Sequence, residues 1–300
     1  MRSEKVISVA VIGTGQIGTD LVERLLRDKS FSIEALVGRR SDSPGLMRFS
    51  DSGIRIVSNG IGGLDDFWDE IDGVFDATSA SSHLEVWPLI QSKGKWAIDL
   101  TPSRVGKPFV PVLSGRTRAM QLDHSVSANY SMVTCGGQSS SPLVFAMSQY
   151  SQSITEVEVS SSIASLSAGP ATRNNLDEYV DATEKVTKIV TGCPSVKSIL
   201  VLNPAEPPVM MRTTVTIRAE EFDLAEIRLL SHELVRDVQS YVPGYDLVVE
   251  PHITPAGDLS ATVKVEGSGY YLPTYSGNLD IINAAAVETA RRHCVQGAGI

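Results

Sequence analysis

The segment Val9-Ala10-Val11-Ile12-Gly13-Thr14-Gly15-Gln16-Ile17-Gly18 decides the fold of the N-terminal region. An apolar strand pattern leads directly into glycines spaced as G-x-G-x-x-G, and a helical pattern follows from Ile17 to Arg27. In such a loop the first glycine permits a tight turn, the second lets backbone approach a pyrophosphate, and the third allows close helix–strand packing. A purely structural glycine turn is the alternative. We predict that a dinucleotide binds at Gly13, Thr14, Gly15, Gln16, Ile17 and Gly18.

The end of the next strand pattern bears on which dinucleotide binds. Ile33–Val37 runs into Gly38-Arg39-Arg40-Ser41, where an NAD enzyme commonly has an acidic residue for the ribose 2′-hydroxyl. The guanidinium groups of Arg39 and Arg40 would instead favour a 2′-phosphate, unless both are simply solvated loop residues. The predicted cofactor is therefore NAD or NADP.

Strand and helix patterns alternate through the first third of the chain. Short strand patterns occur at Val9–Ile12, Ile33–Val37, Val74–Ala77 and Ala97–Leu100, with helical or loop segments between them. This alternation predicts a parallel sheet covered by helices, as in a Rossmann domain.

The pattern changes after Cys135. Period-two alternation appears at Glu156–Ser160, Val215–Ile217 and Thr262–Val265, with helical patterns at about 175–191 and 222–240. We expect an α+β region in which helices cover one face of a mixed, largely antiparallel sheet. A last helical pattern, Leu279 to about Arg292, is apolar enough to pack back on another element.

Composition excludes several classes of partner. The 300 residues carry a net charge of −9, which argues against nucleic acid or an anionic membrane surface as a partner. No stretch has the length and apolarity of a signal peptide core or a membrane span, so we expect a cytoplasmic protein. The three cysteines, Cys135, Cys193 and Cys294, lie far apart, and no metal site is expected.

Cys135 is the candidate nucleophile. It lies in Val133-Thr134-Cys135-Gly136-Gly137-Gln138, between a strand-like stretch and a helical pattern that starts near Pro142. Backbone N–H groups and the positive end of a helix would lower the pKa of a thiol there and hold a developing oxyanion. An inert buried cysteine is the alternative.

Several segments, taken together and in order, resemble the acylating acetaldehyde dehydrogenases, which transfer an acyl group to coenzyme A. The resemblance covers nearly the whole chain. The segments that carry it are Gly13–Asp20, Asp76–Ser79, Ile98–Pro102, Met132–Gln138, Ser167–Pro170, Asn203–Pro208 and Tyr275–Ile281.

The resemblance implies both an architecture and a reaction. Residues 1–133 would form the dinucleotide-binding Rossmann domain, 134–277 a catalytic and dimerisation α+β domain, and 278–300 a helix that returns to the first domain. Cys135 would form a thioester while an aldehyde is oxidised with NAD(P)⁺, and coenzyme A would take up the acyl group. The nicotinamide side of the cofactor would be lined by Ser167, Ala168, Gly169, Pro170, Asn175 and Asn278. A homodimer is implied, and in this family an aldolase is a possible further partner.

The chain departs from the family pattern at Thr213. The family has an aspartate after Met-Arg at this point, and the resemblance gives that aspartate the role of activating the thiol, whereas this chain reads Met211-Arg212-Thr213. A threonine cannot act as a carboxylate base. Either local dipoles and another group, with Glu206 and Asp280 as candidates, activate the thiol, or the chain is a cofactor-binding member with altered substrate or lost turnover that acts as a sensor or partner module.

Overall fold

The computed structural model describes residues 6–123, 125–169, 172–173 and 175–297. The chain divides into two compact units. Unit 1 comprises residues 1–109, 122–132 and 286–300, and unit 2 comprises residues 110–121 and 133–285.

Unit 1 is built on a seven-stranded sheet in which the paired strands run parallel. The strand order is β3-β2-β1-β4-β5-β7-β6. This order reverses direction between β1 and β4, which makes the carboxyl end of β1 the topological switch point where α/β sheets bind ligands. The strands are β1 (Ile7–Ile12), β2 (Phe31–Val37), β3 (Arg55–Val57), β4 (Gly73–Asp76), β5 (Trp96–Asp99), β6 (Lys107–Pro108) and β7 (Asn129–Ser131). The predicted parallel sheet is confirmed.

Helices and short 3₁₀ turns accompany this sheet. They are α1 (Gln16–Leu25), α2 (Pro44–Met47), α3 (Ala80–Ser92), η1 (Ile61–Leu64) and η2 (Trp68–Glu70). Residues of β1, β2 and β4 share one apolar core with Leu64, Trp68 and Ile90. Burial of these side chains, each worth about 1.5–3 kcal/mol, holds the helices and turns to the sheet.

The end of the C-terminal helix α8 (Gly277–Gly297) packs on unit 1, as predicted. Arg291 forms an ion pair with Asp28, and the imidazole of His293 lies edge-on to the rings of Trp96 and Tyr130. The helix begins in unit 2 and ends in unit 1, so it is part of both.

Unit 2 contains a five-stranded mixed sheet in the order β10-β9-β11-β14-β13. β9 and β10 are parallel, and the remaining neighbours are antiparallel. Side chains of β11 alternate between buried and partly exposed, as the period-two pattern predicts. The strands are β9 (Glu156–Ala164), β10 (Val196–Asn203), β11 (Met211–Arg218), β13 (Tyr245–Ile253) and β14 (Leu259–Val265), beside a separate ribbon of β8 (Ser151–Gln152) and β12 (Glu221–Phe222).

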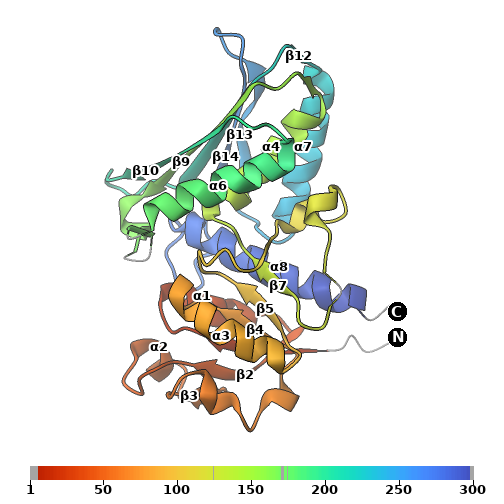
Figure 1. The fold of residues 1–300 in the computed structure, drawn as a ribbon. Helices are drawn as coiled ribbons and strands as arrows, with labels where there is room; N and C mark the ends of the chain where they lie inside the picture. Colours follow the sequence, from red (N-terminus) through yellow and green to blue (C-terminus); the bar gives the residue numbers. More distant parts are fainter. Residues whose placement is uncertain (1–5, 124, 170–171, 174, 298–300) are drawn as a thin grey trace. The chain divides into compact units, whose positions relative to one another are not determined.

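Three helices lie together against one face of this sheet (Figure 1). They are α4 (Cys135–Gln149), α6 (Leu176–Thr191) and α7 (Leu224–Gln239), and the short turns η3 (Pro111–Leu113), η4 (Arg118–Met120) and η5 (Ser165–Ser167) complete unit 2. The predicted helical layer is confirmed, but its first helix begins earlier than expected. Cys135 is the first residue of α4, and Pro142 lies inside the helix. The glycines and serines after Cys135 have low helix propensity, which hides the true start in the sequence.

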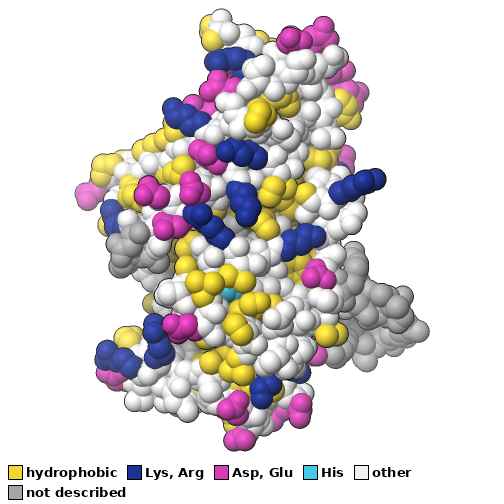
Figure 2. Space-filling view, viewed as in Figure 1, with side chains coloured by type: hydrophobic (Ala, Val, Ile, Leu, Met, Phe, Trp, Pro, Cys, Tyr) yellow, Lys and Arg dark blue, Asp and Glu magenta, His cyan; other side chains and the backbone are white. Residues whose placement is uncertain are grey.

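Figure 2 shows basic and acidic side chains interspersed over the face in view. In the described part of the chain, no helix has the length and apolarity needed to span a bilayer. The predicted cytoplasmic location stays a prediction.

Candidate active site

The glycine loop of unit 1 needs glycine at two positions for steric reasons. Gly13 has φ +107°, and a Cβ there would come within 2.5 Å of the Ala77 carbonyl oxygen. A Cβ on Gly18 would come within 2.0 Å of the Gly13 oxygen. Both positions bring backbone too close for any side chain, so the loop closes tightly over the end of β1.

Gly15 differs from these two because the space beside it is open. A Cβ at this position would meet no heavy atom within 4 Å, and Gly15 caps α1 with no side-chain hydrogen bond. An anion can therefore approach the positive end of the helix beside Gly15. Thr14 holds the loop to the segment after β2 through a 2.7 Å hydrogen bond with Ser43. Gln16 is exposed, and Ile17 is half-buried. The loop fits a pyrophosphate group.

The two arginines after β2 are not equivalent. Both are exposed, but Arg40 forms an ion pair with Asp42 at 2.6 Å, whereas the guanidinium of Arg39 forms no ion pair within the described residues. Since a carboxylate already binds Arg40, Arg39 is the stronger candidate for a 2′-phosphate contact.

In unit 2 the backbone presents Cys135 at the start of α4. The Thr134 hydroxyl caps the helix by accepting a hydrogen bond from the Gly137 N–H at 2.8 Å. Val133, just before the cap, has φ +51°, a rare conformation for a β-branched residue that costs about 1–3 kcal/mol. Such strain is typical of functional sites. Cys135 as a whole residue is partly exposed.

The prediction of a lowered thiol pKa is wrong for this environment. Burial raises the pKa of Cys135 from about 9.0 to about 11, and hydrogen bonds from Tyr179 and the backbone N–H groups of Gly136 and Cys135 offset only part of this rise. The helix end is present as predicted, but the desolvation cost exceeds its benefit. Cys135 is therefore a neutral thiol near pH 7.

Tyr179 is a neighbour of the thiol that the sequence did not reveal. Its hydroxyl oxygen lies 4.0 Å from the Cys135 sulfur. A Cβ on Gly136 would lie 2.0 Å from the same oxygen, so glycine at 136 leaves the room that Tyr179 occupies. Tyr179 comes from α6, 44 residues along the chain, and no local motif marks it.

Neither carboxylate considered for thiol activation contributes to the pKa of Cys135. Glu206 is exposed, and the Asp280 carboxylate accepts hydrogen bonds from the backbone N–H and side chain of Ser268. Thr213 is completely buried, and its hydroxyl bonds to Ser139 and Ser161. Among the described residues, the groups that interact with the thiol are thus the Tyr179 hydroxyl and the backbone of Gly136 and Cys135.

The predicted nicotinamide-side residues lie in unit 2, and two of them make direct contact. The Asn278 amide donates to the Ser167 carbonyl at 3.4 Å, while the buried Oδ1 of Asn278 has no hydrogen-bond partner within the described residues. That free acceptor fits a ligand with an amide donor, such as a nicotinamide carboxamide. Ala168 is buried and Gly169 is partly exposed. Pro170 lies outside the described residues.

Two further polar residues, Asn175 and Arg173, follow Ser167 in the chain. Asn175 is half-buried at the start of α6 and provides no side-chain cap. Arg173 donates to the carbonyls of Ala168 and Ser165, each at 2.9 Å, so it stabilises the loop that carries Ser167.

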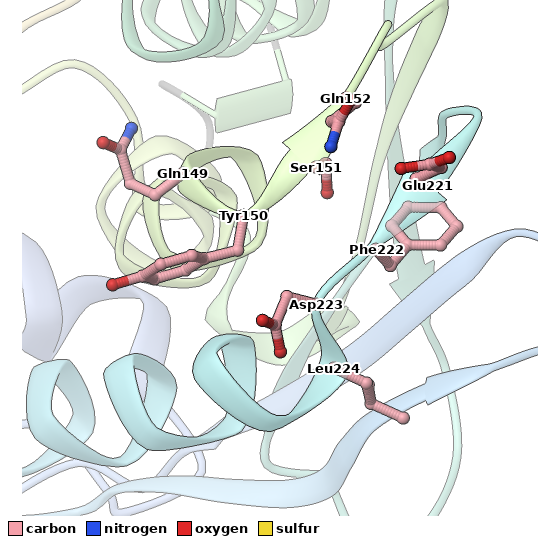
Figure 3. A pocket seen from close by; sticks show the side chains of 8 residues that line it. All are labelled: Gln149, Tyr150, Ser151, Gln152, Glu221, Phe222, Asp223 and Leu224. Carbon is pink, nitrogen blue, oxygen red and sulfur yellow. The ribbon is translucent and has the colours of Figure 1, made fainter.

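A cavity of about 530 Å³ opens elsewhere in unit 2, between the end of α4 and the start of α7 (Figure 3). None of the predicted site residues lines it. Its lining residues are Gln149, Tyr150, Ser151, Gln152, Glu221, Phe222, Asp223 and Leu224.

A dinucleotide loop in one unit and a thiol at a capped helix end in the other are features of an NAD-binding oxidoreductase. Residues 8–115 match the family model "Semialdehyde dehydrogenase, NAD binding domain", and residues 135–273 match "Prokaryotic acetaldehyde dehydrogenase, dimerisation".

Full-length relatives then identify the family. The chain is 44% identical over 283 residues to an acetaldehyde dehydrogenase of Pectobacterium atrosepticum, covering 94% of each chain. It is 45% identical over 289 residues to one of Spirochaeta aurantia, covering 96% of this chain and 95% of the relative. The chain belongs to the acetaldehyde dehydrogenase family, as predicted, and is an aldehyde-oxidising type of oxidoreductase. These relatives do not favour a module without turnover.

A solved structure shares the fold. Aspartate semialdehyde dehydrogenase II from Vibrio cholerae, complexed with ASA, superposes with a TM-score of 0.59 at 14% identity, over 97% of this chain and 99% of that one. At this identity the likeness concerns architecture alone.

Proposed function

We propose that this protein is a CoA-acylating aldehyde dehydrogenase that converts an aldehyde, coenzyme A and NAD(P)⁺ into an acyl-CoA, NAD(P)H and a proton. The observation that carries the proposal is the placement of Cys135. It is a half-buried thiol on the first turn of a capped helix, in a chain whose relatives are named acetaldehyde dehydrogenases.

Cys135 would act as the nucleophile. Its sulfur, once ionised, attacks the carbonyl carbon of the aldehyde and forms a hemithioacetal. Negative charge develops on the former carbonyl oxygen. The N–H groups of Cys135 and Gly136, which interact with the sulfur at the positive end of α4, would stabilise this charge.

The residues that fit the cofactor have separate tasks. Gly13 to Gly18 would hold its pyrophosphate, Arg39 a 2′-phosphate where one is present, and Asn278 the carboxamide. When bound, the nicotinamide supplies the acceptor for the hydride that the aldehyde carbon loses. Oxidation leaves an acyl thioester on Cys135, which retains enough reactivity for a second thiol to displace it.

Coenzyme A is proposed as that second thiol. Its sulfur attacks the thioester carbon, the Cys135 thiolate leaves, and the acyl group departs on coenzyme A. Burial favours this outcome because it limits the access of water, the competing nucleophile. The match to a dimerisation model over residues 135–273 further supports a homodimer, while an aldolase partner stays a prediction.

An assay of cofactor reduction tests the proposal. The protein is mixed with short and medium aldehydes, NAD⁺ or NADP⁺, and either coenzyme A, phosphate or neither, and acyl-CoA is measured by mass spectrometry. Cys135→Ser and Cys193→Ser are compared, because Cys193 is a buried cysteine without a proposed role. We expect coenzyme A-dependent reduction that is lost only in Cys135→Ser. Acyl phosphate instead of acyl-CoA, or full activity in Cys135→Ser, would contradict the proposal.

A further inference from the structure

A continuous chain of buried hydroxyl groups starts at the Cys135 sulfur. Tyr179 is 7% exposed and lies 4.0 Å from the sulfur. The Tyr179 and Ser161 hydroxyls lie beside each other, because a Cβ on Gly136 would come within 2.0 Å of the first oxygen and 3.0 Å of the second. The Ser161 oxygen lies 3.0 Å from the Thr213 hydroxyl. That hydroxyl lies 2.8 Å from Ser139, on α4. Ser161, Thr213 and Ser139 are at most 1% exposed, so their hydrogen bonds are screened from water.

The fold rather than the local sequence assembles this chain. Thr213 on β11 is the cross-strand partner of Ser161 on β9, which brings the two hydroxyls together on the helix-covered face of the sheet. Ser139 comes from α4, and Tyr179 from α6. Four separate segments thus meet near Cys135.

When Cys135 is protonated, the hydrogen bonds along this chain of hydroxyl groups can point in only one direction, because each hydroxyl has one proton. Ser139 donates to the Gly136 carbonyl at 3.2 Å, which uses its only proton. Thr213 must then donate to Ser139, and Ser161 to Thr213. Tyr179 donates to Ser161, and its oxygen accepts the thiol proton. Each hydroxyl is satisfied in this arrangement.

The reverse arrangement suits an ionised sulfur. When Cys135 gives its proton to water, Tyr179 can turn its hydroxyl towards the sulfur. Ser161 then donates to Tyr179, and Thr213 to Ser161. Ser139 turns its proton from the Gly136 carbonyl to Thr213. The Tyr179 oxygen then accepts from Ser161, so its own proton is free for the sulfur. The chain changes direction by rotating hydroxyls and neither gains nor loses a proton.

We propose that Tyr179 is a catalytic hydrogen-bond donor to the ionised Cys135 sulfur, and that Ser161, Thr213 and Ser139 are positioning residues that orient its hydroxyl. This deepens the proposed function, on which it rests for the role of Cys135 as nucleophile. The Tyr179 phenol suits the task because burial keeps its pKa well above 10, so it remains a donor when the thiol ionises.

The charge on the sulfur determines in which direction the pKa of Cys135 changes when one of these hydroxyls is removed. Hydrogen bonds that lead to an ionised group are stronger than those between neutral groups, and neighbouring bonds polarise one another. Removing one of the hydroxyls therefore destabilises the thiolate more than the thiol, and this raises the pKa of Cys135. Within the described residues, the groups that act on that pKa are Tyr179 and the backbone of Gly136 and Cys135, and no charged side chain is among them.

The test measures alkylation of Cys135 by iodoacetamide as a function of pH, read peptide by peptide with mass spectrometry. In this reaction the thiolate displaces iodide and forms a thioether. We expect Tyr179→Phe to lower the rate at pH 8 by about tenfold, equivalent to about one pKa unit. Tyr150→Phe, the same change at the far end of α4, is the control and should match the wild type.

Variants at Thr213 test the rest of the chain. We expect Thr213→Val to lower the alkylation rate by about threefold and Thr213→Ser to restore it, because a hydroxyl returns. Packing alone predicts the opposite order, since valine conserves the buried volume and serine leaves a cavity. Circular dichroism and thermal unfolding identify any variant that fails to fold, and the remaining variants still decide the result.

Each outcome decides the inference. If Tyr179→Phe is alkylated as fast as the wild type or faster, Tyr179 does not have the proposed role. If Thr213→Ser is alkylated more slowly than Thr213→Val, the chain of hydroxyl groups does not orient Tyr179. Alkylation requires no aldehyde, cofactor or coenzyme A. If the variants behave as expected but no acyl-CoA forms, only the proposed reaction fails; if acyl-CoA forms and alkylation is insensitive to Tyr179, only this inference fails.

Discussion

The Thr134 hydroxyl lies 2.7 Å from the Thr183 hydroxyl, and this contact joins the cap of α4 to α6. Thr183 in turn donates to the carbonyl of Tyr179 at 2.8 Å. Because Thr134 immediately precedes Cys135, this buried pair fixes the thiol relative to the helix that carries Tyr179.

Replacing Thr134 by alanine should therefore lower the free energy of unfolding by about 1–2 kcal/mol, because the helix loses its cap and Thr183 loses a buried partner. Thr155→Ala, which removes an exposed hydroxyl with one 3.3 Å bond, should change it by less than about 0.5 kcal/mol. Urea unfolding of the two variants checks this. Equal stability of both would contradict the structural role of the cap.

Two glycines of the cofactor loop should respond differently to alanine. Gly13→Ala combines positive φ with a backbone clash and should cost about 2 kcal/mol of stability. Gly15→Ala has open space and should leave stability unchanged, yet weaken dinucleotide binding by about tenfold because the methyl group lies where the pyrophosphate approaches. Thermal unfolding and cofactor titration separate the effects. If Gly15→Ala binds the dinucleotide with unaltered affinity, the loop is not part of the binding site.

Arg39 is expected to determine how well the protein uses NADP⁺, the cofactor that carries a 2′-phosphate. We predict that Arg39→Gln lowers kcat/KM with NADP⁺ by about tenfold and leaves kcat/KM with NAD⁺ within about twofold, because only NADP⁺ offers the phosphate. Arg40→Gln is the matched control, since Arg40 already pairs with Asp42. Equal losses with both cofactors would show that Arg39 acts on something other than the 2′-phosphate.

Unit 1 contains a buried charge cluster that should make stability depend on pH. His83 Nδ1 lies 2.9 Å from Asp76 and 3.8 Å from Asp99, and all three side chains are fully buried. Burial by itself would lower the pKa of His83, but the hydrogen bond with Asp76 and the charges of Asp99 and Asp76 raise it overall. A pKa raised by folding gives stability that is complete below the unfolded value of about 6.5 and is lost as pH rises through the folded value.

The expected result is a stability difference between the wild type and His83→Gln that is largest near pH 6 and shrinks by about pH 9. Chemical unfolding of both proteins across this range measures it. A difference that stays constant or grows with pH would mean that His83 is neutral in the folded protein.

Much of unit 1 could be read from the sequence because its signals are local. The strand, the glycine loop and α1 are consecutive, and Gly13 and Gly18 are constrained by atoms of neighbouring segments in a way common to such loops. The period-two pattern also revealed β9, β11 and β14 of unit 2, but not β10 or β13. The start of α4 was missed because glycine and serine suppress the helical pattern that Thr134 nonetheless caps.

By itself, the sequence determined the α/β architecture, the dinucleotide loop and the position of the candidate thiol, since each depends on residues adjacent in the chain. Only the tertiary structure decided the electrostatic state of that thiol and its neighbours. Burial depends on packing from distant segments, and it reversed the expected pKa shift of Cys135. Tyr179, Ser161 and Thr213 become one hydrogen-bonded group only when α6 and two paired strands come together around α4.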